Sequence, residues 1–291
     1  MHYKLFFGFV IVLSVVGCNI INPEEQIPSY IHLEPFTFVA GPDDGGSTSK
    51  ITEAWVYVGG DLLGAYTLPA TFPVLQSGTV EVLCDPGIYD NGRKVTPELY
   101  PFYRRYTTSV TLVTGDTVTI SPTTGYDPNT ADFKFIETFE SSNSLTIDMD
   151  ANAATFVSLV DNPTEVREGT RSGVMVLNAD NKVGEVAAAL ETSLPRTNTP
   201  IYIEMDYRSD ANFLVGLNGV NSDGTQDRLY HDVEFFPRPE WNKLYINMTD
   251  YIQPADKEYD AYRVIILAAL DADHTSGNIY LDNIKLISLK Q

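Results

Sequence analysis

The chain has few cysteines and few histidines. It contains two cysteines, Cys18 and Cys84, and four histidines among 291 residues. Two cysteines cannot form a disulfide framework, so a hydrophobic core must stabilise the fold. The histidines are scattered without the spacing of metal ligands, and no nucleophile elbow, zinc-protease helix or phosphate-binding loop is present. The sequence therefore predicts a protein that is not an enzyme, although abundant carboxylates leave a glycosidase pair open.

Positive charge is also scarce. The chain has 19 Lys and Arg residues against 39 Asp and Glu residues, which gives a formal net charge of -20. Such a surface repels nucleic acid and anionic lipid head groups. We therefore exclude nucleic acid as a partner.

One apolar run stands out at the N-terminus. Residues 5–16 are almost wholly apolar, Lys4 precedes them and Gly17-Cys18 follows. The run is shorter than the roughly 20 residues of a membrane span, and it has the layout of a secretory signal. Gly17-Cys18 resembles the lipobox of bacterial lipoproteins, in which the cysteine is acylated, for example with palmitate, after the signal is removed. An ordinary signal peptide that contains a cysteine is the alternative.

The lipoprotein resemblance implies a membrane anchor and a place in the cell envelope. It predicts a signal peptide over residues 1–17, lipidation at Cys18 and a tether over residues 18–28. Glu24 and Glu25 resemble the acidic residues that follow the cysteine in surface-exported lipoproteins of the Bacteroidota. We therefore expect a lipid-anchored protein of the outer membrane, with acyl chains that hold it there.

Beyond the tether the pattern is that of short strands. The chain has 17 Tyr and 14 Phe, frequent Val and Thr, and no sustained 3.6-residue period. We predict an all-β protein with a small antiparallel β-sandwich over residues 29–126 and a β-jelly roll over residues 132–291. The polar cluster at residues 125–130 marks the boundary. Within the first domain, residues 107–113 are expected to pair with residues 117–121 across a turn, and Cys84 to lie half-buried in a strand.

Both domains resemble known modules. Residues 56–66, followed by Leu68-Pro69 and Gly78, are similar to PEGA-like and transthyretin-type accessory domains, which act mostly as spacers. Residues 132–291 resemble carbohydrate-binding modules of the galactose-binding-like jelly-roll type. Three segments carry that resemblance: residues 137–140, residues 168–177 and residues 279–286.

The second resemblance implies one structural calcium ion. In such modules calcium often lies where the first and last strands meet near a Ser-Gly turn, and the matching residues here are Glu140 and Asp282. Carboxylate and carbonyl oxygens are the ligands that calcium prefers. The alternative is that Glu140 pairs with Arg171 or Lys285, or caps a turn.

One face of the predicted jelly roll gathers aromatic and charged side chains. Alternation places Tyr202, Glu204 and Asp206 on one side of a strand, and Trp241, Lys243 and Tyr245 on one side of another. If the two faces coincide, they could stack on a sugar ring and bind its hydroxyls. Alternatively, the face is covered, with Lys243 paired to Glu204 or Asp206 and Trp241 packed under a loop.

The sequence thus favours non-catalytic binding of a glycan by the jelly roll. The competing hypothesis is a structural or assembly protein whose jelly roll binds another envelope protein. An open aromatic strip would favour the glycan, and a broad apolar patch would favour the protein partner.

Overall fold

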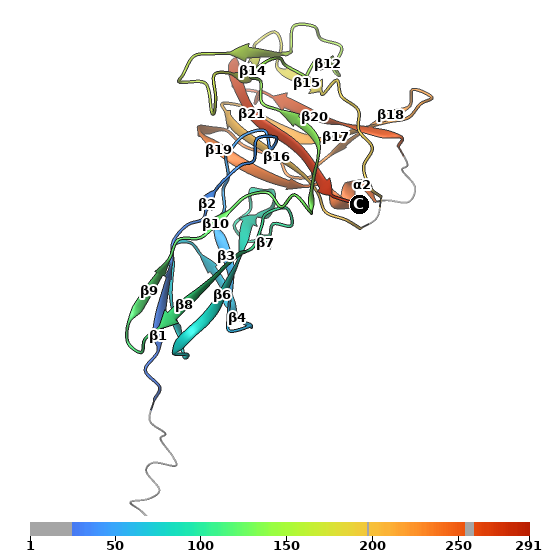
Figure 1. Ribbon diagram of the computed structural model, residues 1–291. Helices are drawn as coiled ribbons and strands as arrows, with labels where there is room; N and C mark the ends of the chain where they lie inside the picture. Colours follow the sequence, from blue (N-terminus) through green and yellow to red (C-terminus); the bar gives the residue numbers. More distant parts are fainter. Residues whose placement is uncertain (1–24, 197, 254–258) are drawn as a thin grey trace, which may run out of the picture.

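The computed structural model describes residues 25–196, 198–253 and 259–291, which form two β-rich domains joined end to end (Figure 1). Cys18, the predicted signal peptide and most of the predicted tether lie outside these residues. No helix among the described residues is long and apolar enough to cross a membrane. The prediction of an all-β fold is confirmed.

The first domain is a small β-sandwich. Its strands are β1 (Ser29–Leu33), β2 (Thr37–Phe38), β3 (Glu53–Val58), β4 (Asp61–Thr67), β5 (Ala70–Val74), β6 (Gly78–Tyr89), β7 (Pro97–Leu99), β8 (Tyr106–Leu112), β9 (Thr117–Ile120) and β10 (Thr123–Thr124), with a short 3-10 helix, η1 (Asp90–Gly92). One sheet has the order β5-β1-β9, and the other has the order β4-β3-β6-β7 with β8 also on β6. Cys84 lies fully buried in the core between them.

The predicted pairing of residues 107–113 with residues 117–121 is wrong. β8 pairs with β6, whereas β9 pairs in parallel with β1 in the opposite sheet. The turn at Gly115, where φ is +84°, therefore leads the chain from one sheet to the other instead of closing a hairpin. A second parallel pair, β10 with β2, lies at the junction between the domains (Figure 1).

The second domain packs two antiparallel sheets face to face. Its elements are β11 (Ala131–Glu137), β12 (Ile147–Asp148), β13 (Val157–Val160), β14 (Ser172–Asn178), β15 (Val183–Ala187), β16 (Ile201–Ser209), β17 (Asn212–Val220), β18 (Gln226–Tyr230), β19 (Arg238–Asn247), α2 (Thr249–Ile252), β20 (Ala261–Ala269) and β21 (Ser276–Leu289). The six-stranded sheet has the order β13-β14-β21-β16-β19, with β11 also on β21, and the five-stranded sheet has the order β12-β15-β20-β17-β18.

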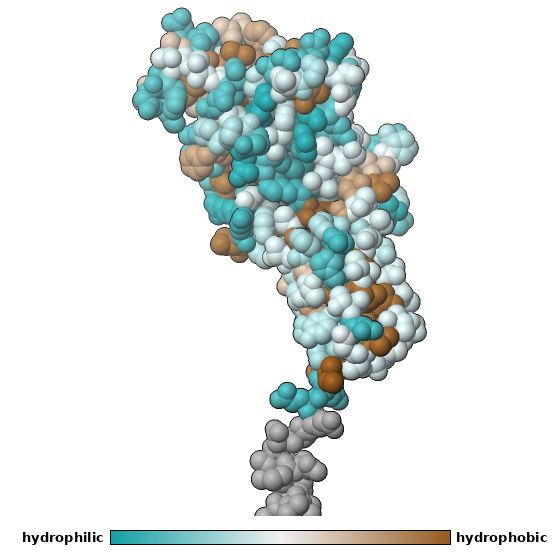
Figure 2. Space-filling model, turned by 90° about the vertical axis from the view of Figure 1, so that its left-hand side faces the viewer, coloured by the Kyte–Doolittle hydropathy of each residue, from teal (hydrophilic) through white to brown (hydrophobic). Residues whose placement is uncertain are grey.

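Alternation along the strands produces the core of the second domain. Ile203, Met205 and Ile246 point inward from the six-stranded sheet. Val215 and Ile266 meet them from the five-stranded sheet. The surface in Figure 2 is largely hydrophilic over the second domain, with apolar residues in small separate groups.

Candidate functional site

The structure brings the predicted aromatic and charged face together. β16 and β19 are neighbours, and the register places Tyr202 opposite Asn247, Glu204 opposite Tyr245 and Asp206 opposite Lys243. All of these side chains lie on the outer face of the six-stranded sheet, because the alternate residues fill the core.

That face lies against the first domain and is closed to a ligand in this structure. Tyr100 and Tyr126 of the connecting segments donate hydrogen bonds to the Glu204 carboxylate at 2.6 and 2.7 Å. Tyr100 also packs edge-on against Tyr202 and Tyr245, with ring centroids 5.3 and 4.9 Å apart. We call this buried zone the interdomain layer; its apolar and aromatic members are Ile88, Tyr100, Phe102, Tyr103, Tyr126, Ala131, Tyr202, Tyr245 and Ile287.

Four buried charges lie in the interdomain layer. Lys243 Nζ is 3.0 Å from Glu204 and 3.8 Å from Asp206, and these three side chains are at most 1% exposed. Lys285 is fully buried beside them and donates a hydrogen bond to the Tyr126 hydroxyl at 3.0 Å. This is the covered arrangement given above as the alternative, with Lys243 paired to both acids.

The electrostatics of the layer keep Glu204 ionised. Burial by itself raises the pKa of Glu204. The charges of Lys243 and Lys285 and the two tyrosine hydroxyls lower it by more, so the net shift of this pKa is downward. Burial also lowers the pKa of Lys285, with Lys243 as the next cause, to about 8. The layer therefore holds buried ion pairs whose charges compensate one another.

Trp241 lies apart from the interdomain layer, half-buried near the rim of the same sheet. The Arg208 guanidinium lies 5.8 Å from the Trp241 ring and 4.2 Å from the Tyr280 ring. Tyr280 in turn donates a hydrogen bond to Glu165 at 2.9 Å. Trp241 is thus a packing residue in this stack, and the six predicted glycan-binding residues form no common open surface.

Glu140 binds the loop that precedes β14, and Asp282 binds the first residue of β14. Glu140 accepts hydrogen bonds from the backbone N–H groups of Thr170 and Arg171, at 2.8 and 3.1 Å. Asp282 accepts from the Ser172 hydroxyl at 2.7 Å, and burial raises its pKa to about 6. These contacts fit a capped turn better than a shared ion, since N–H groups point at the carboxylate oxygens. Calcium at this place stays a prediction.

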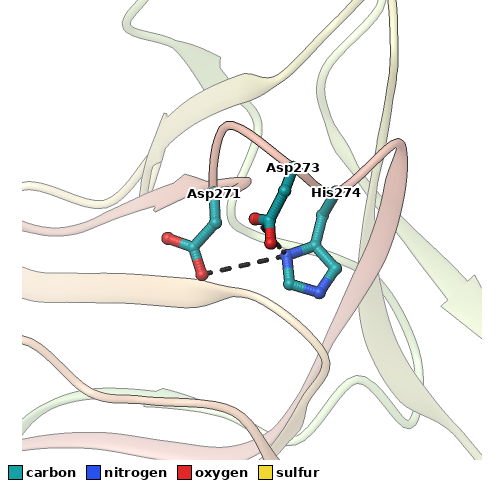
Figure 3. A group of neighbouring side chains, drawn as sticks. All are labelled: Asp271, Asp273 and His274. Carbon is teal, nitrogen blue, oxygen red and sulfur yellow. Dashed lines mark ion pairs between the residues drawn. The ribbon is translucent and has the colours of Figure 1, made fainter.

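Among the described residues, one group of three side chains has its potential metal-ligating atoms within 4.8 Å of one another. It consists of Asp271, Asp273 and His274 on the turn between β20 and β21 (Figure 3). His274 Nδ1 lies 3.4 Å from Asp273 and 3.9 Å from Asp271, and all three residues are exposed. Neither Glu140 nor Asp282 belongs to the group, and exposed acidic groups of this kind are common without an ion.

A cleft of about 440 Å³ opens beside the interdomain layer, and we call it the interdomain cleft. The first domain contributes Lys50 and residues 91–93 to its wall, and the second contributes residues 232–238 together with Tyr207, Asn242 and Leu244. The domains are fixed at this point, because the Asn91 side chain accepts a hydrogen bond from the Asn247 backbone N–H at 2.9 Å. A volume of this size is within the range of small-ligand sites.

The chemistry of the interdomain cleft is mixed. Phe236 stands at the cleft with 65% of its surface exposed, and the Asn91 and Asn242 side-chain amides line the same cleft. The oxygen of each amide already accepts one hydrogen bond, from the Asn247 N–H and from Lys50 respectively. Lys50 Nζ donates to Asn242 Oδ1 at 2.5 Å. An exposed aromatic ring next to amides and cations can bind the face of a sugar ring and its hydroxyls.

Sequence reasoning missed the interdomain cleft because its residues come from four separate segments of the chain. Lys50, Arg93 and Arg238 lie in loops or at a strand end, outside the alternating patterns that identified the sheet faces. The one local signal was Phe235-Phe236-Pro237, an apolar pair before a proline in a stretch without strand alternation.

The outer face of the five-stranded sheet is the other large surface of the second domain. Glu185 of β15 accepts hydrogen bonds from Arg228 and Tyr230 of β18, both at 2.5 Å, across the two strands between them. The backbones of β17 and β18 approach closely here, since a Cβ on Gly216 would lie 2.3 Å from the Leu229 carbonyl oxygen. These three polar side chains bind one another.

No protein family and no curated protein matches the chain. Among solved structures, the C-terminal family 22 carbohydrate-binding module of Clostridium thermocellum Xyn10B is 20% identical with a TM-score of 0.37, over 56% of this chain and 95% of the module. The CBM22-1 xylan-binding domain of Paenibacillus barcinonensis Xyn10C is 14% identical with a TM-score of 0.37, over 57% and 99%.

A third similar structure is the family 11 carbohydrate-binding module of Clostridium thermocellum in complex with a β-1,3-1,4-mixed-linked tetrasaccharide. It is 12% identical with a TM-score of 0.38, over 55% of this chain and 96% of the module. At these TM-scores the likeness carries no information on the ligand or the site.

Proposed function

We propose that the protein is a non-catalytic glycan-binding protein, anchored to the cell envelope by a lipid on Cys18, and that the interdomain cleft binds the glycan. The observation that carries the proposal is the exposed ring of Phe236 beside the amides of Asn91 and Asn242 in an open cleft. The first domain then serves as a spacer that also supplies part of the binding site.

Substitution of Phe236 tests the glycan site. With a ligand identified on a glycan array, Phe236→Ala is expected to raise the Kd at least about tenfold in calorimetry, because a central aromatic contact is lost. The matched control is Phe156→Ala, since Phe156 is 58% exposed and lies away from the interdomain cleft. It should leave the Kd unchanged.

Two outcomes would count against the interdomain cleft as the glycan site. If Phe236→Ala binds like the unchanged protein while Tyr230→Ala loses binding, the glycan binds the five-stranded sheet instead. If no glycan on the array binds, the result favours the competing hypothesis, in which the partner is another protein of the envelope.

Substitution of Cys18 tests the anchor. Cys18→Ala is expected to abolish fatty-acid labelling and to move the protein from the membrane fraction to the soluble fraction or block its maturation. The physical reason is that several acyl chains, at roughly 0.8 kcal/mol per buried CH₂, provide the attachment. Cys84→Ala is the control, because Cys84 is buried in the first domain and is not available for acylation. Persistent labelling of the Cys18→Ala protein would contradict the lipobox assignment.

A further inference from the structure

The interdomain cleft concentrates positive charge on a strongly acidic protein. Lys50, Arg93 and Arg238 line it, although the chain as a whole has only 19 Lys and Arg residues and a net charge of -20. The cleft wall also includes two exposed carboxylates, Asp232 and Glu234. The three cations outnumber them, so the charge of the wall is opposite to that of the chain.

The cations of the interdomain cleft lack acidic partners within the part of the chain that the structure describes. There, the ion pairs of 4.0 Å or less include Lys243, Arg167, Arg228 and Arg263, but none of the three cations of the cleft. The nearest polar partner of Lys50 is an uncharged amide, that of Asn242. Asp232 and Glu234 therefore line the same cleft without a described ion pair to any of its three cations.

Two of the cleft cations, Lys50 and Arg238, repel each other. The pKa of Lys50 is lowered first by burial and then by the charges of Arg238 and Lys94. Repulsion of this kind is relieved when an anion binds between the cations. A guanidinium matches a carboxylate in a bidentate geometry, and two arginines at the cleft are free to form such pairs.

We propose that the interdomain cleft selects an acidic oligosaccharide, with the carboxylate of a uronic acid residue bound by Arg93 and Arg238. This inference rests on the proposed glycan-binding function and adds the ligand class. Arg238 begins β19 two residues after Phe236, so one short segment presents both a ring for the face of the sugar and a guanidinium for its carboxylate. Arg93 lines the same cleft from the first domain, and the site is complete only when both domains are present.

Binding to matched acidic and neutral ligands tests the ligand class. The probes are trisaccharides of galacturonate, mannuronate and glucuronate, each with its methyl ester, which keeps the ring and linkage but removes the charge. In calorimetry with the full chain, at least one acid is expected to bind tenfold or more tightly than its ester. Arg238→Gln and Arg93→Gln should each raise the Kd of that acid about fivefold or more and leave the Kd of its ester unchanged.

A matched control separates the specific site from general charge. Arg171→Gln removes one exposed positive charge on the second domain away from the interdomain cleft, and it should not alter the Kd of the acid. Both arginines of the cleft are exposed, so their loss should leave the melting temperature unchanged.

Three outcomes would overturn the assignment. Equal affinity for acid and ester, with Phe236→Ala still weakening both, would leave the glycan site in place and remove its acidic specificity. Tight binding of the acid that is insensitive to Arg93→Gln and Arg238→Gln would place the anion elsewhere. Binding of no sugar at all would remove the glycan site and its specificity together.

Discussion

Lys243→Met is expected to lower the free energy of unfolding by about 3–5 kcal/mol, because it leaves the buried Glu204 carboxylate without its closest cation. Glu204 and Asp206 are both fully buried, and Lys243 is within 4.0 Å of each. Asp206 would keep its contact with Arg167, and Lys285 would remain near Glu204 as the second buried lysine of the interdomain layer. Denaturation in urea at neutral pH, with the melting temperature as a second readout, measures the loss.

The control for this prediction is a lysine in an ion pair at the surface. Lys134 lies 2.7 Å from Asp132, and the two side chains are 25% and 33% exposed. Lys134→Met should cost less than about 1 kcal/mol, because water and salt screen such pairs. Adding Glu204→Gln to Lys243→Met should restore part of the lost stability. A loss below about 1 kcal/mol for Lys243→Met would contradict the buried ion pair.

A fragment of residues 131–291 is expected to fold by itself but to melt about 10 °C below the full chain. It retains the whole core between the two sheets of the second domain. However, it loses Tyr100, Phe102 and Tyr103, which cover the outer face of the six-stranded sheet. A loss of a few kcal/mol corresponds to a shift of this size in a domain of about 160 residues. Calorimetry of the fragment and the full chain measures it.

The same fragment offers a sharper comparison. In it Lys243→Met should shift the melting temperature by less than about 2 °C, because Glu204 and Asp206 gain access to water once the first domain is absent. An equally large effect in fragment and full chain would mean that the first domain does not bury these charges. A fragment without a cooperative transition would mean that both domains share one folding unit.

Strand alternation was sufficient to predict the fold class and the direction of individual side chains. Ile203 and Met205 point into the core while Glu204 and Asp206 point outward, as the two-residue period requires. Strand alternation did not predict which residues cover the outer face of the six-stranded sheet, because that cover depends on packing between segments far apart in the sequence. The aromatic residues within 100–103 were the available signal, since large rings outside the strands need a surface to cover.

Pairing between strands was harder to predict than the strands themselves. Residues 107–113 and 117–121 have the pattern of a hairpin, with a Gly-Asp turn between them, yet they belong to opposite sheets. A turn constrains only its own dihedral angles, and the partner of each strand is decided by which apolar face it must bury. The residues of the interdomain cleft are likewise brought together from segments far apart in the sequence. No local sequence pattern around Arg93 or Arg238 therefore indicates a binding site.

The interdomain layer has a mechanical consequence. The described chain begins at the end of the first domain that lies away from the second domain (Figure 1). The interdomain cleft lies at the junction, between walls from both domains. A force that pulls the second domain away from the first would therefore load the contacts of Tyr100, Glu204 and Lys243 in the layer. Buried ion pairs resist small displacements and are lost together once water enters. The interdomain layer is accordingly expected to be stiff under weak load and to open abruptly under strong load. The two walls of the interdomain cleft would then separate at the same moment.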